Sequence, residues 1–519
     1  MATISRIRNN SLALAGGVAA LSACGTPQKP AKPNVVFILL DDSGYCDFGC
    51  YGQTKTETPN IDALAANGIR FTDFYAGAPQ SSPSRCGLLT GLHNGHTQIR
   101  ANDEQYWRGD VFSLKAMMEH PELEGQAPMA EGTVTLGTMM QQAGYTTGMI
   151  GKWGLGGPTS ESVPNKMGFD FYYGYLCQRS AQCYYPQYLY RNGEREFLGN
   201  PFMELGTKLP IDLDEYDIVN YEPYKGTVYS PDAMYTEVEN FITQNKEHPF
   251  FLMWTTTIPH SAMQAPDEYI QHYVEKFGDE EPVARSNGYF PCRYPRATYA
   301  AMISYLDMQI GKMVQHLKDE GVYDNTIIIV TSDNGPAQSK CNSSAWFDNS
   351  HPFHSEDGYT KRTLQEGGIR MPFIFTWGDR VKPSVCTDPA WFPDMMPTFC
   401  EMAGVDEPYE TDGISLWPTF SGKARRQQHH PYLYWEFPAF KKARGYLAVR
   451  MGEYKGLVKN VADGGNTMEL YRINEDPLEE HDLSAEHPDI VRKMWEIIRT
   501  EHTPHDNPVM NTQINWPQQ

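Results

Sequence analysis

Polar side chains with catalytic or metal-binding chemistry lie next to five short apolar runs of this sequence. They are Asp41 and Asp42 after 34–40, Lys152 after 146–150, His260 after 250–254, Asp333 and Asn334 after 326–330, and Lys361 ahead of 372–377. Alone, each motif is usually a turn, a helix cap or a solvated side chain. Together, three carboxylates and an amide oxygen would need a hard divalent cation, Ca²⁺ or Mg²⁺, to offset their repulsion. Lysines and a histidine beside that cation favour an anionic substrate.

A serine-rich motif, Ser81-Ser82-Pro83-Ser84-Arg85, adds a second candidate for chemistry. Pro83 suits the first position of a helix and Ser82 its N-cap, which predicts Ser81 at the helix N-terminus. Free N–H groups and the helix dipole favour an anion there. An ordinary capped helix would also explain the motif.

The elements that must position these residues alternate along the chain. Continuous apolar runs that alternate with helical patterns predict an α/β fold with a large, mostly parallel mixed sheet flanked by helices. The expected strands are 34–40, 146–150, 250–254, 326–330 and 372–377, and the expected helices are 135–143, 231–245 and 298–320. Ligands bind at the carboxyl ends of the strands in such sheets, which would bring the polar residues to one edge.

The composition changes near residue 420, and short alternating strands at 445–451 and 453–458 precede a helix at 488–502. This pattern predicts a small α+β C-terminal subdomain with a short antiparallel sheet and a helix. The expected domains are a signal segment 1–23, a Pro-rich tether 24–33, a catalytic domain 34–422 and a C-terminal subdomain 423–519.

The charge balance limits the class of partner. The 519 residues include 64 acidic and 43 basic side chains, for a net charge of −21, with 40% hydrophobic residues. That composition is typical of a globular protein and excludes bulk disorder. A strongly acidic chain repels nucleic acid, so we expect no nucleic-acid partner and expect any anion to be bound in a local cationic pocket.

The N-terminal segment is typical of an export signal. Arg6 and Arg8 precede a small apolar run, 11–21, that is too short to span a bilayer. The following Leu21-Ser-Ala-Cys24 resembles a bacterial lipobox, which predicts a lipoprotein anchored through Cys24 in the periplasm or at the cell surface. An ordinary signal peptide with a chance cysteine is the alternative. No later run is long enough for a transmembrane helix, so the lipid is the expected membrane contact.

Several motifs in order carry a specific resemblance. Ser81-x-Pro83-Ser84-Arg85 followed by Leu89-Thr90-Gly91, together with the segments 412–418 and 470–477, resembles the formylglycine-dependent (type I) sulfatases of the alkaline phosphatase superfamily. The chain is similar to the bacterial arylsulfatase A-like carbohydrate sulfatases of that family. The resemblance extends from about residue 34 to past 502 and implies an alkaline phosphatase-like fold.

The resemblance also implies roles for the residues. Ser81 would be oxidised to formylglycine (3-oxoalanine) by an oxygen-independent sulfatase-maturing enzyme. One Ca²⁺ would be held by Asp41, Asp42, Ser81, Asp333 and Asn334. Arg85, Lys152 and Lys361 would bind the sulfate group, and His260 would protonate the leaving oxygen as general acid. The sequence departs from the family at Gly151-Lys152-Trp153-Gly154, because many sulfatases have a catalytic histidine where this chain has Gly154.

The expected substrate is a sulfated mono- or oligosaccharide, cleaved at a chain end. Candidate substrate-binding residues are Gln178 and Arg179 in an aromatic segment, Arg100 after the serine motif, and Glu436 in the C-terminal subdomain. His93, Asn94, His96 and Asn102 are further candidates, although a surface loop would explain them equally well. The two other functions considered are a phosphoester or phosphonate hydrolase of the same superfamily and a non-catalytic glycan-binding lipoprotein. The spacings of Cys46/Cys50 and Cys177/Cys183 would allow disulfides but do not decide them.

Overall fold

The computed structural model describes residues 32–285, 288–339, 341–441 and 443–517, which belong to one compact unit. The predicted signal segment 1–23 and Cys24 lie outside the described residues. In the part of the chain that is described, no helix is long and apolar enough to cross a membrane. Cys46, Cys50, Cys177 and Cys183 are thiols, so neither pair permitted by the sequence spacing forms a disulfide.

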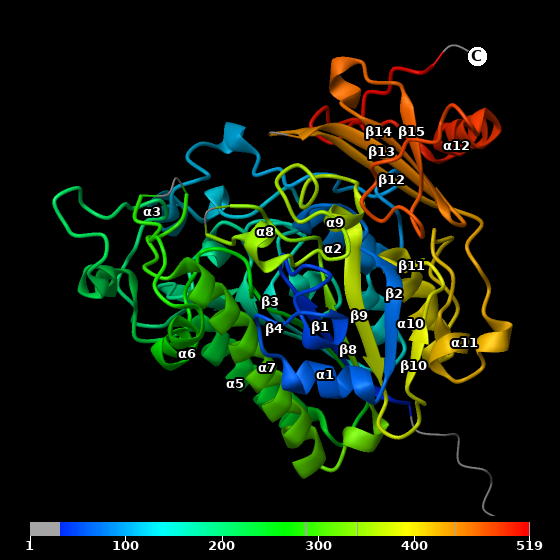
Figure 1. Cartoon of the computed structure of the whole chain (residues 1–519). Coiled ribbons are helices and arrows are strands. Elements are labelled where there is room, and N and C mark those ends of the chain that lie inside the picture. The colour runs from blue at the N-terminus through cyan, green and yellow to red at the C-terminus, as the bar shows by residue number, and fades with distance from the viewer. Residues whose placement is uncertain (1–31, 286–287, 340, 442, 518–519) are drawn as a thin grey trace, which may run out of the picture. The chain divides into compact units, whose positions relative to one another are not determined.

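A large mixed sheet forms the centre of the protein (Figure 1). Within the described residues its strand order is β10-β2-β9-β8-β1-β7-β3-β4-β5-β6, with β11 paired to β2. The strands are β1 Asn34–Leu40, β2 Ile69–Tyr75, β3 Thr146–Lys152, β4 Phe171–Tyr175, β5 Tyr188–Arg191, β6 Glu194–Phe197, β7 Phe250–Thr255, β8 Thr326–Ser332, β9 Arg370–Thr376, β10 Ser384–Cys386 and β11 Ala390–Trp391. The α/β fold with a large mixed sheet is thus confirmed.

Strands β8, β1, β7, β3 and β4 are parallel neighbours, so their carboxyl ends share one edge of the sheet. Strand β9 runs antiparallel to β8, with Thr331 opposite Phe373. The beginning of β9 therefore lies at the same edge as the end of β8. This pairing explains how the segment before β9 reaches the site although it precedes a strand.

The sheet is buried on both faces. Strand β1 shows this, because its side chains alternate between two hydrophobic clusters. Val36 and Ile38 belong to one cluster, whereas Val35 and Phe37 belong to the other. Helices α1 Pro59–Ala66, α5 Ser230–Asn245, α6 Asp267–Phe277 and α7 Pro295–Asp319 pack in the first cluster. Helices α2 Ser81–Thr90, α4 Leu136–Gln142, α10 Met395–Ala403 and α11 Trp417–Phe420 pack in the second. The remaining short helices are α3 Leu114–Glu119, α8 Ser344–Phe347 and α9 Glu366–Ile369.

A second, antiparallel sheet has the order β12-β13-β14-β15. Its elements are β12 Leu433–Phe440, β13 Ala443–Met451, β14 Tyr454–Lys459 and β15 Met468–Arg472, with helix α12 Pro488–Glu501 on one face. Its other face packs Trp435 and Phe437 with Tyr75 of β2 and Ile369 of α9. Figure 1 shows this sheet in orange on the side of the molecule where α2 and α9 lie. The small antiparallel C-terminal sheet is confirmed.

Helix α2 begins earlier than the sequence motif suggested. The Gln80 carbonyl accepts the Ser84 N–H at 3.1 Å, which makes Gln80 the N-cap and Ser81 the first helical residue. The prediction of Ser82 as N-cap and Pro83 as first residue is therefore wrong. A side chain from a distant loop replaces the local cap, because Asn102 Oδ1 accepts the Ser82 N–H at 2.9 Å. Pro83 still lies in the first turn, where its missing N–H costs no helical hydrogen bond.

The loop after β1 is fastened by a buried carboxyl group, Asp47. Its Oδ2 accepts hydrogen bonds from the Gly44 N–H at 2.6 Å and from the Tyr299 hydroxyl of α7 at 2.9 Å. Its Oδ1 is buried with no hydrogen-bond partner among the described residues. Burial raises the pKa of Asp47 to about 7, although its hydrogen bonds from Gly44 and Tyr299 act in the opposite direction.

We predict that Asp47→Asn removes a pH-dependent loss of stability. The folded state keeps the Asp47 proton up to about pH 7, whereas the unfolded chain releases it near pH 4, so wild-type stability falls as pH rises between these values. As pH rises across that window, the free energy of unfolding of the variant should increase relative to that of the wild type by up to about 4 kcal/mol. Above the window the difference between the two proteins should stay constant. Chemical unfolding of both proteins at pH 5 and pH 8 measures the difference. An equal free-energy gap at both pH values would contradict the prediction.

Candidate active site

The two carboxylates that follow β1 lie at the carboxyl edge of the large sheet. The Asp41 N–H donates to the Ile258 carbonyl at 3.1 Å, and the Asp333 N–H donates to the Leu40 carbonyl at 3.0 Å. The Asp42 N–H donates to Asp333 Oδ1 at 3.2 Å. These bonds join the ends of β1 and β8 to the loop after β7. All three carboxylates are buried.

Ser81 faces this carboxylate group from the N-terminus of α2. Its Oγ lies 3.2 Å from Asp41 Oδ1 and 3.2 Å from Asn334 Oδ1. The Asn334 amide nitrogen donates to Asp42 Oδ1 at 2.7 Å. Oxygens from two strand ends and one helix therefore converge around the Ser81 hydroxyl.

Three basic side chains neutralise the carboxylates. Lys152 Nζ lies 2.5 Å from Asp41 Oδ2, and Lys361 Nζ lies 2.5 Å from Asp42 Oδ1. Arg85 Nε donates to Asp333 Oδ2 at 2.9 Å, while its Nη2 is buried without a hydrogen-bond partner among the described residues. One donor of this guanidinium thus remains available to a ligand in the site.

The electrostatic balance keeps the carboxylates of Asp41 and Asp42 charged. Burial would raise the pKa of Asp41, but Lys152, His260 and Arg85 together hold it below its ordinary value. Burial likewise opposes ionisation of Asp42, whose pKa is lowered by Lys361 and His260. The ionised carboxylates are therefore stable in a site that excludes bulk water.

His260 reaches the same group from the loop after β7. Its Nδ1–H donates to the Ser261 carbonyl at 2.5 Å, which leaves Nε2 facing Asp42 Oδ2 at 3.5 Å. Burial lowers the pKa of His260, against the opposing influence of Asp42 and Asp41. The Tyr289 ring lies with its centroid 6.2 Å from that of His260.

The donor set fits a hard divalent cation. Ligand atoms of Asp41, Asp42 and His260 lie within 4.8 Å of one another, and the oxygens of Ser81 and Asn334 lie beside Asp41. Carboxylate, amide and hydroxyl oxygens suit Ca²⁺ or Mg²⁺ better than a soft metal. The structure brings together the nine residues assigned to catalysis and metal binding, which are Asp41, Asp42, Ser81, Arg85, Lys152, His260, Asp333, Asn334 and Lys361.

The residue found at the position of the expected histidine is a glycine with left-handed backbone, Gly154 at φ +78°. A Cβ at this position would lie 2.8 Å from both Cγ and Nε2 of Gln178. The Gln178 amide nitrogen donates to Ser82 Oγ, and its Oε1 accepts from Asn102 Nδ2 at 2.9 Å. Gln178 thus fills the space beside Gly154 and contacts the residue that follows Ser81.

The other candidate substrate residues have different surroundings. Arg100 Nη1 lies 3.0 Å from Glu436 Oε1, and both side chains are buried in the contact between the first sheet's loops and β12. Asn94 Nδ2 donates to the Glu436 carbonyl at 2.6 Å in the same contact. Arg179 donates through Nε to the Phe112 carbonyl at 3.1 Å.

His93 and His96 form a cluster away from Ser81. Their rings stack at 4.0 Å, His93 Nε2 lies 2.9 Å from Glu501, and His96 Nδ1 lies 2.9 Å from Asp412. The Gly95 N–H donates to His93 Nδ1 at 3.1 Å, so Nε2 carries the ring proton of neutral His93. To bind a metal through Nε2, His93 would need that nitrogen without its proton and the proton on Nδ1 instead. The cluster therefore fits a structural contact between α12 and the loops of the first sheet.

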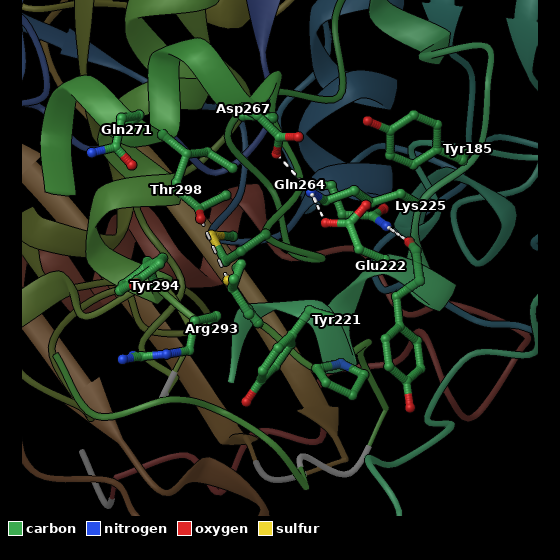
Figure 2. A pocket seen from close by; sticks show the side chains of 17 residues that line it. Tyr185, Tyr221, Glu222, Lys225, Gln264, Asp267, Gln271, Arg293, Tyr294 and Thr298 are labelled. Carbon is green, nitrogen blue, oxygen red and sulfur yellow. Dashed lines mark hydrogen bonds and ion pairs between the residues drawn. The ribbon is translucent and has the colours of Figure 1, made fainter. Parts of the chain in front are cut away.

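A separate cavity of about 160 Å³ is lined by residues of the segments 185–225, 263–271 and 291–298, among them Gln264 and Thr298 (Figure 2). Its one lysine, Lys225, pairs with Glu222 at 2.9 Å and with Asp267 at 2.6 Å. Arg293 in the same wall pairs with Asp279 at 2.5 Å, so both basic side chains of the cavity have carboxylate partners. None of the nine catalytic and metal-binding residues lines this cavity.

Two residues beside the site were not assigned from the sequence, Tyr289 and Arg362. Arg362 directly follows Lys361, and that adjacency was the available signal. Tyr289 lies far from the recognised motifs in the chain, and only the fold brings its ring next to His260.

Comparisons with known proteins identify the family of the chain. Residues 33–405 match the family model described as Sulfatase, and residues 355–503 match the model described as N-sulphoglucosamine sulphohydrolase, C-terminal. Arylsulfatase A of Homo sapiens is 29% identical over 468 residues, covering 86% of this chain and 77% of the relative. N-acetylgalactosamine-6-O-sulfatase of Bacteroides thetaiotaomicron is 27% identical over 566 residues, covering 97% of this chain and all (100%) of the relative.

A solved structure has the same fold. The crystal structure of Ps i-CgsB in complex with k-i-k-neocarrahexaose superposes with a TM-score of 0.69 at 26% identity, covering 93% of this chain and 95% of that chain. The family match extends over most of the described catalytic unit and includes every element that supplies the buried carboxylates, Ser81 and the basic residues. The chain therefore belongs to the sulfatase family and is a sulfuric ester hydrolase.

Proposed function

We propose that this enzyme releases inorganic sulfate from the end of a sulfated carbohydrate, using a formylglycine made from Ser81 and one Ca²⁺. The observation that carries the proposal is the position of the Ser81 hydroxyl, 3.2 Å from oxygens of both Asp41 and Asn334 at the N-terminus of α2. Arg85, Lys152 and Lys361 surround the same point with positive charge. A tetrahedral anion has donors on several sides there.

The site residues would have three roles, which are charge stabilisation, proton donation and metal binding. Lys152, Lys361 and Arg85 Nη2, which makes no hydrogen bond within the described chain, would stabilise charge on the sulfuryl oxygens. His260, with Nδ1–H held by the Ser261 carbonyl, presents Nε2 to the departing sugar oxygen, and as the imidazolium, which Asp42 at 3.5 Å favours, it would donate the Nε2 proton to that oxygen. The aspartates and Asn334 would hold the Ca²⁺, which supplies Lewis-acid stabilisation, and the hydrated aldehyde of formylglycine supplies a nucleophilic oxygen.

The carbohydrate part of the proposal rests on the relatives and on burial. One relative is named an N-acetylgalactosamine-6-O-sulfatase, and the solved structure carries k-i-k-neocarrahexaose. The Ser81 and Asp42 side chains are fully buried, with 0% exposure each, so a sulfate at a chain end reaches them more readily than one within a polymer. We propose exo action for this reason.

Export and lipid anchoring at Cys24, in the periplasm or at the cell surface, remain part of the proposal. The support is the sequence 6–24, with its two arginines, apolar run and lipobox-like end. An exported enzyme would meet polymeric carbohydrates that do not enter the cell.

The first experiment is the mass of the tryptic peptide 71–85, from protein made with an oxygen-independent sulfatase-maturing enzyme. Loss of two hydrogens at Ser81 should make it about 2 Da lighter than the sequence mass. Protein made without the maturing enzyme, and the Ser81→Ala variant, should both lack turnover of 4-nitrophenyl sulfate. An unmodified peptide from protein that hydrolyses 4-nitrophenyl phosphate would favour a phosphoester hydrolase instead.

His260→Ala tests the general acid. Because a sugar alkoxide is a poor leaving group, kcat for a sugar sulfate should fall about 100-fold or more, against less than about tenfold for 4-nitrophenyl sulfate. Steady-state kinetics on both substrates give the two ratios. His429→Ala, at an exposed histidine, is the matched control and should change neither. Equal losses on both substrates would remove His260 from the acid role.

We also propose that the Gln178 side chain occupies the space of the histidine expected at Gly154. Its contacts with Ser82 and Asn102 position the start of α2. Gly154→Ala should lose about 1–3 kcal/mol of unfolding free energy, because its Cβ meets Gln178 in a left-handed backbone. The double variant with Gln178→Ala should recover part of that loss. Denaturant unfolding of the two single variants and the double variant measures the coupling, and strict additivity would contradict the contact.

A further inference from the structure

A second group of buried charges lies between the large sheet and the C-terminal sheet. Its centre is Glu366, the first residue of α9, whose side chain is fully buried. Lys455 Nζ of β14 lies 2.8 Å from Glu366 Oε1, and Arg370 Nη1 of β9 lies 2.9 Å from Glu366 Oε2. The Tyr75 hydroxyl of β2 donates to the same Oε2 at 2.8 Å. Glu366 thus has partners from both sheets.

Lys455 joins Glu366 to a second acid from the C-terminal part of the chain. Its Nζ also lies 2.9 Å from Glu479 Oε1, and Glu479 Oε2 accepts the backbone N–H of Glu366 at 2.8 Å. The Lys455 and Glu366 side chains have 0% exposure, and that of Glu479 has 3%. One ammonium group therefore lies between two carboxyl groups that bulk water does not reach. Together, Lys455 and Glu479 hold both the side chain and the backbone at the start of α9.

Two arginines complete this network. Arg370 Nη2 lies 2.8 Å from Asp73 Oδ2, and Arg450 Nη2 lies 2.7 Å from Asp73 Oδ1. Although burial would raise it, Lys455, Arg370 and Arg450 hold the pKa of Glu366 at about 2. Glu366 is therefore a buried anion. Removing one of its cationic partners would leave a buried charge without full compensation, which α9 can relieve only by moving.

Helix α9 is packed directly against the residue that follows Asn334. The Gly335 N–H donates to the Gly368 carbonyl at 3.0 Å. The contact leaves no room for a side chain, because a Cβ at Gly335 would lie 2.1 Å from the Gly367 carbonyl oxygen. A displacement of α9 would therefore also displace the segment that carries Asn334.

The residues just before α9 contact the active site at three further points. The Lys361 N–H donates to the Pro336 carbonyl at 3.1 Å, and the Arg362 N–H donates to the Pro79 carbonyl, ahead of α2, at 2.8 Å. Lys361 Nζ lies 2.5 Å from Asp42 Oδ1. This segment therefore joins the start of α9 to the loop after β8, to the residues before α2 and to a carboxylate of the site.

We propose that Lys455 and Glu479 are positioning residues for catalysis. They act through Glu366 and α9 on Lys361 and Asn334, so the inference rests on the roles proposed for these two residues in binding sulfate and Ca²⁺. An ammonium and an amide oxygen that are already fixed need no reorganisation when charge develops in the transition state. The C-terminal sheet thereby contributes to catalysis without supplying one of the nine catalytic and metal-binding residues.

The kinetic test uses Lys455→Met, which removes the ammonium group, and Glu479→Ala, which removes the acceptor of the Glu366 N–H. Misplacement of Lys361 should lower kcat of the matured enzyme for 4-nitrophenyl sulfate about tenfold or more, and should change KM by a smaller factor. Glu479→Gln still offers an oxygen to that N–H and should keep most of the wild-type kcat. Should Lys455→Met fail to fold, the comparison of Glu479→Ala with Glu479→Gln decides.

Ile498→Ala is the matched control for stability. Ile498 of α12 is fully buried on the face of the C-terminal sheet opposite Trp435 and Phe437. Its truncation should lower the unfolding temperature of the protein, as Lys455→Met does, but leave kcat at 25 °C unchanged. Equal losses of kcat in Ile498→Ala and Lys455→Met would show that the stability of the sheet alone matters, and would overturn the positioning role.

Hydrogen exchange gives a readout that does not need turnover. Lys455→Met and Glu479→Ala should speed amide exchange in the segments 333–337 and 361–368, whereas Ile498→Ala should not. Unchanged exchange in these segments, or an unchanged kcat in both variants, would overturn the proposal. A matured wild-type protein without turnover would instead contradict the proposed function, and the exchange rates would still decide whether Lys455 and Glu479 position the two segments.

Discussion

The structure depends on the neutralisation of three buried carboxylates by three basic side chains at one edge of the sheet. Asp41, Asp42 and Asp333 approach one another without bulk water, and Lys152, Lys361 and Arg85 offset their repulsion at 2.5–2.9 Å. A buried charge without a partner would cost several kcal/mol. The position of each of these six residues therefore requires the others, and the strand ends, α2 and the segment before β9 must all meet at this edge.

The C-terminal antiparallel sheet stabilises this group of charged residues by packing against β2 and α9 at the edge of the large sheet. Trp435 and Phe437 pack on Tyr75 and Ile369, and Lys455 Nζ contacts Glu366 Oε1 at 2.8 Å at the start of α9. Glu366 lies five residues after Lys361. The C-terminal sheet thereby stabilises the loop that brings Lys361 to Asp42, which explains why a small sheet far along the chain is part of the same compact unit.

The basic side chains of the catalytic centre have a fixed geometry. In the catalytic centre the basic side chains are paired with carboxylates, so they stabilise new negative charge while remaining fixed. Gln178 supports the same centre, because it fills the space beside Gly154 and contacts Ser82, the residue after Ser81.

The pattern of residues was enough to predict the α/β class, most of the central strands and the polar groups at the strand ends, whereas the roles of Ser81 and Arg85 came from the resemblance of their motif to the sulfatases. The pattern could do so because buried strands are continuous apolar runs and because the carboxyl ends of parallel strands share one edge. Only the folded chain shows that Gln80 and Asn102 replace the local cap of α2 and that Arg100 pairs with Glu436. These outcomes depend on contacts between residues distant in the chain, which no local pattern of residue types encodes.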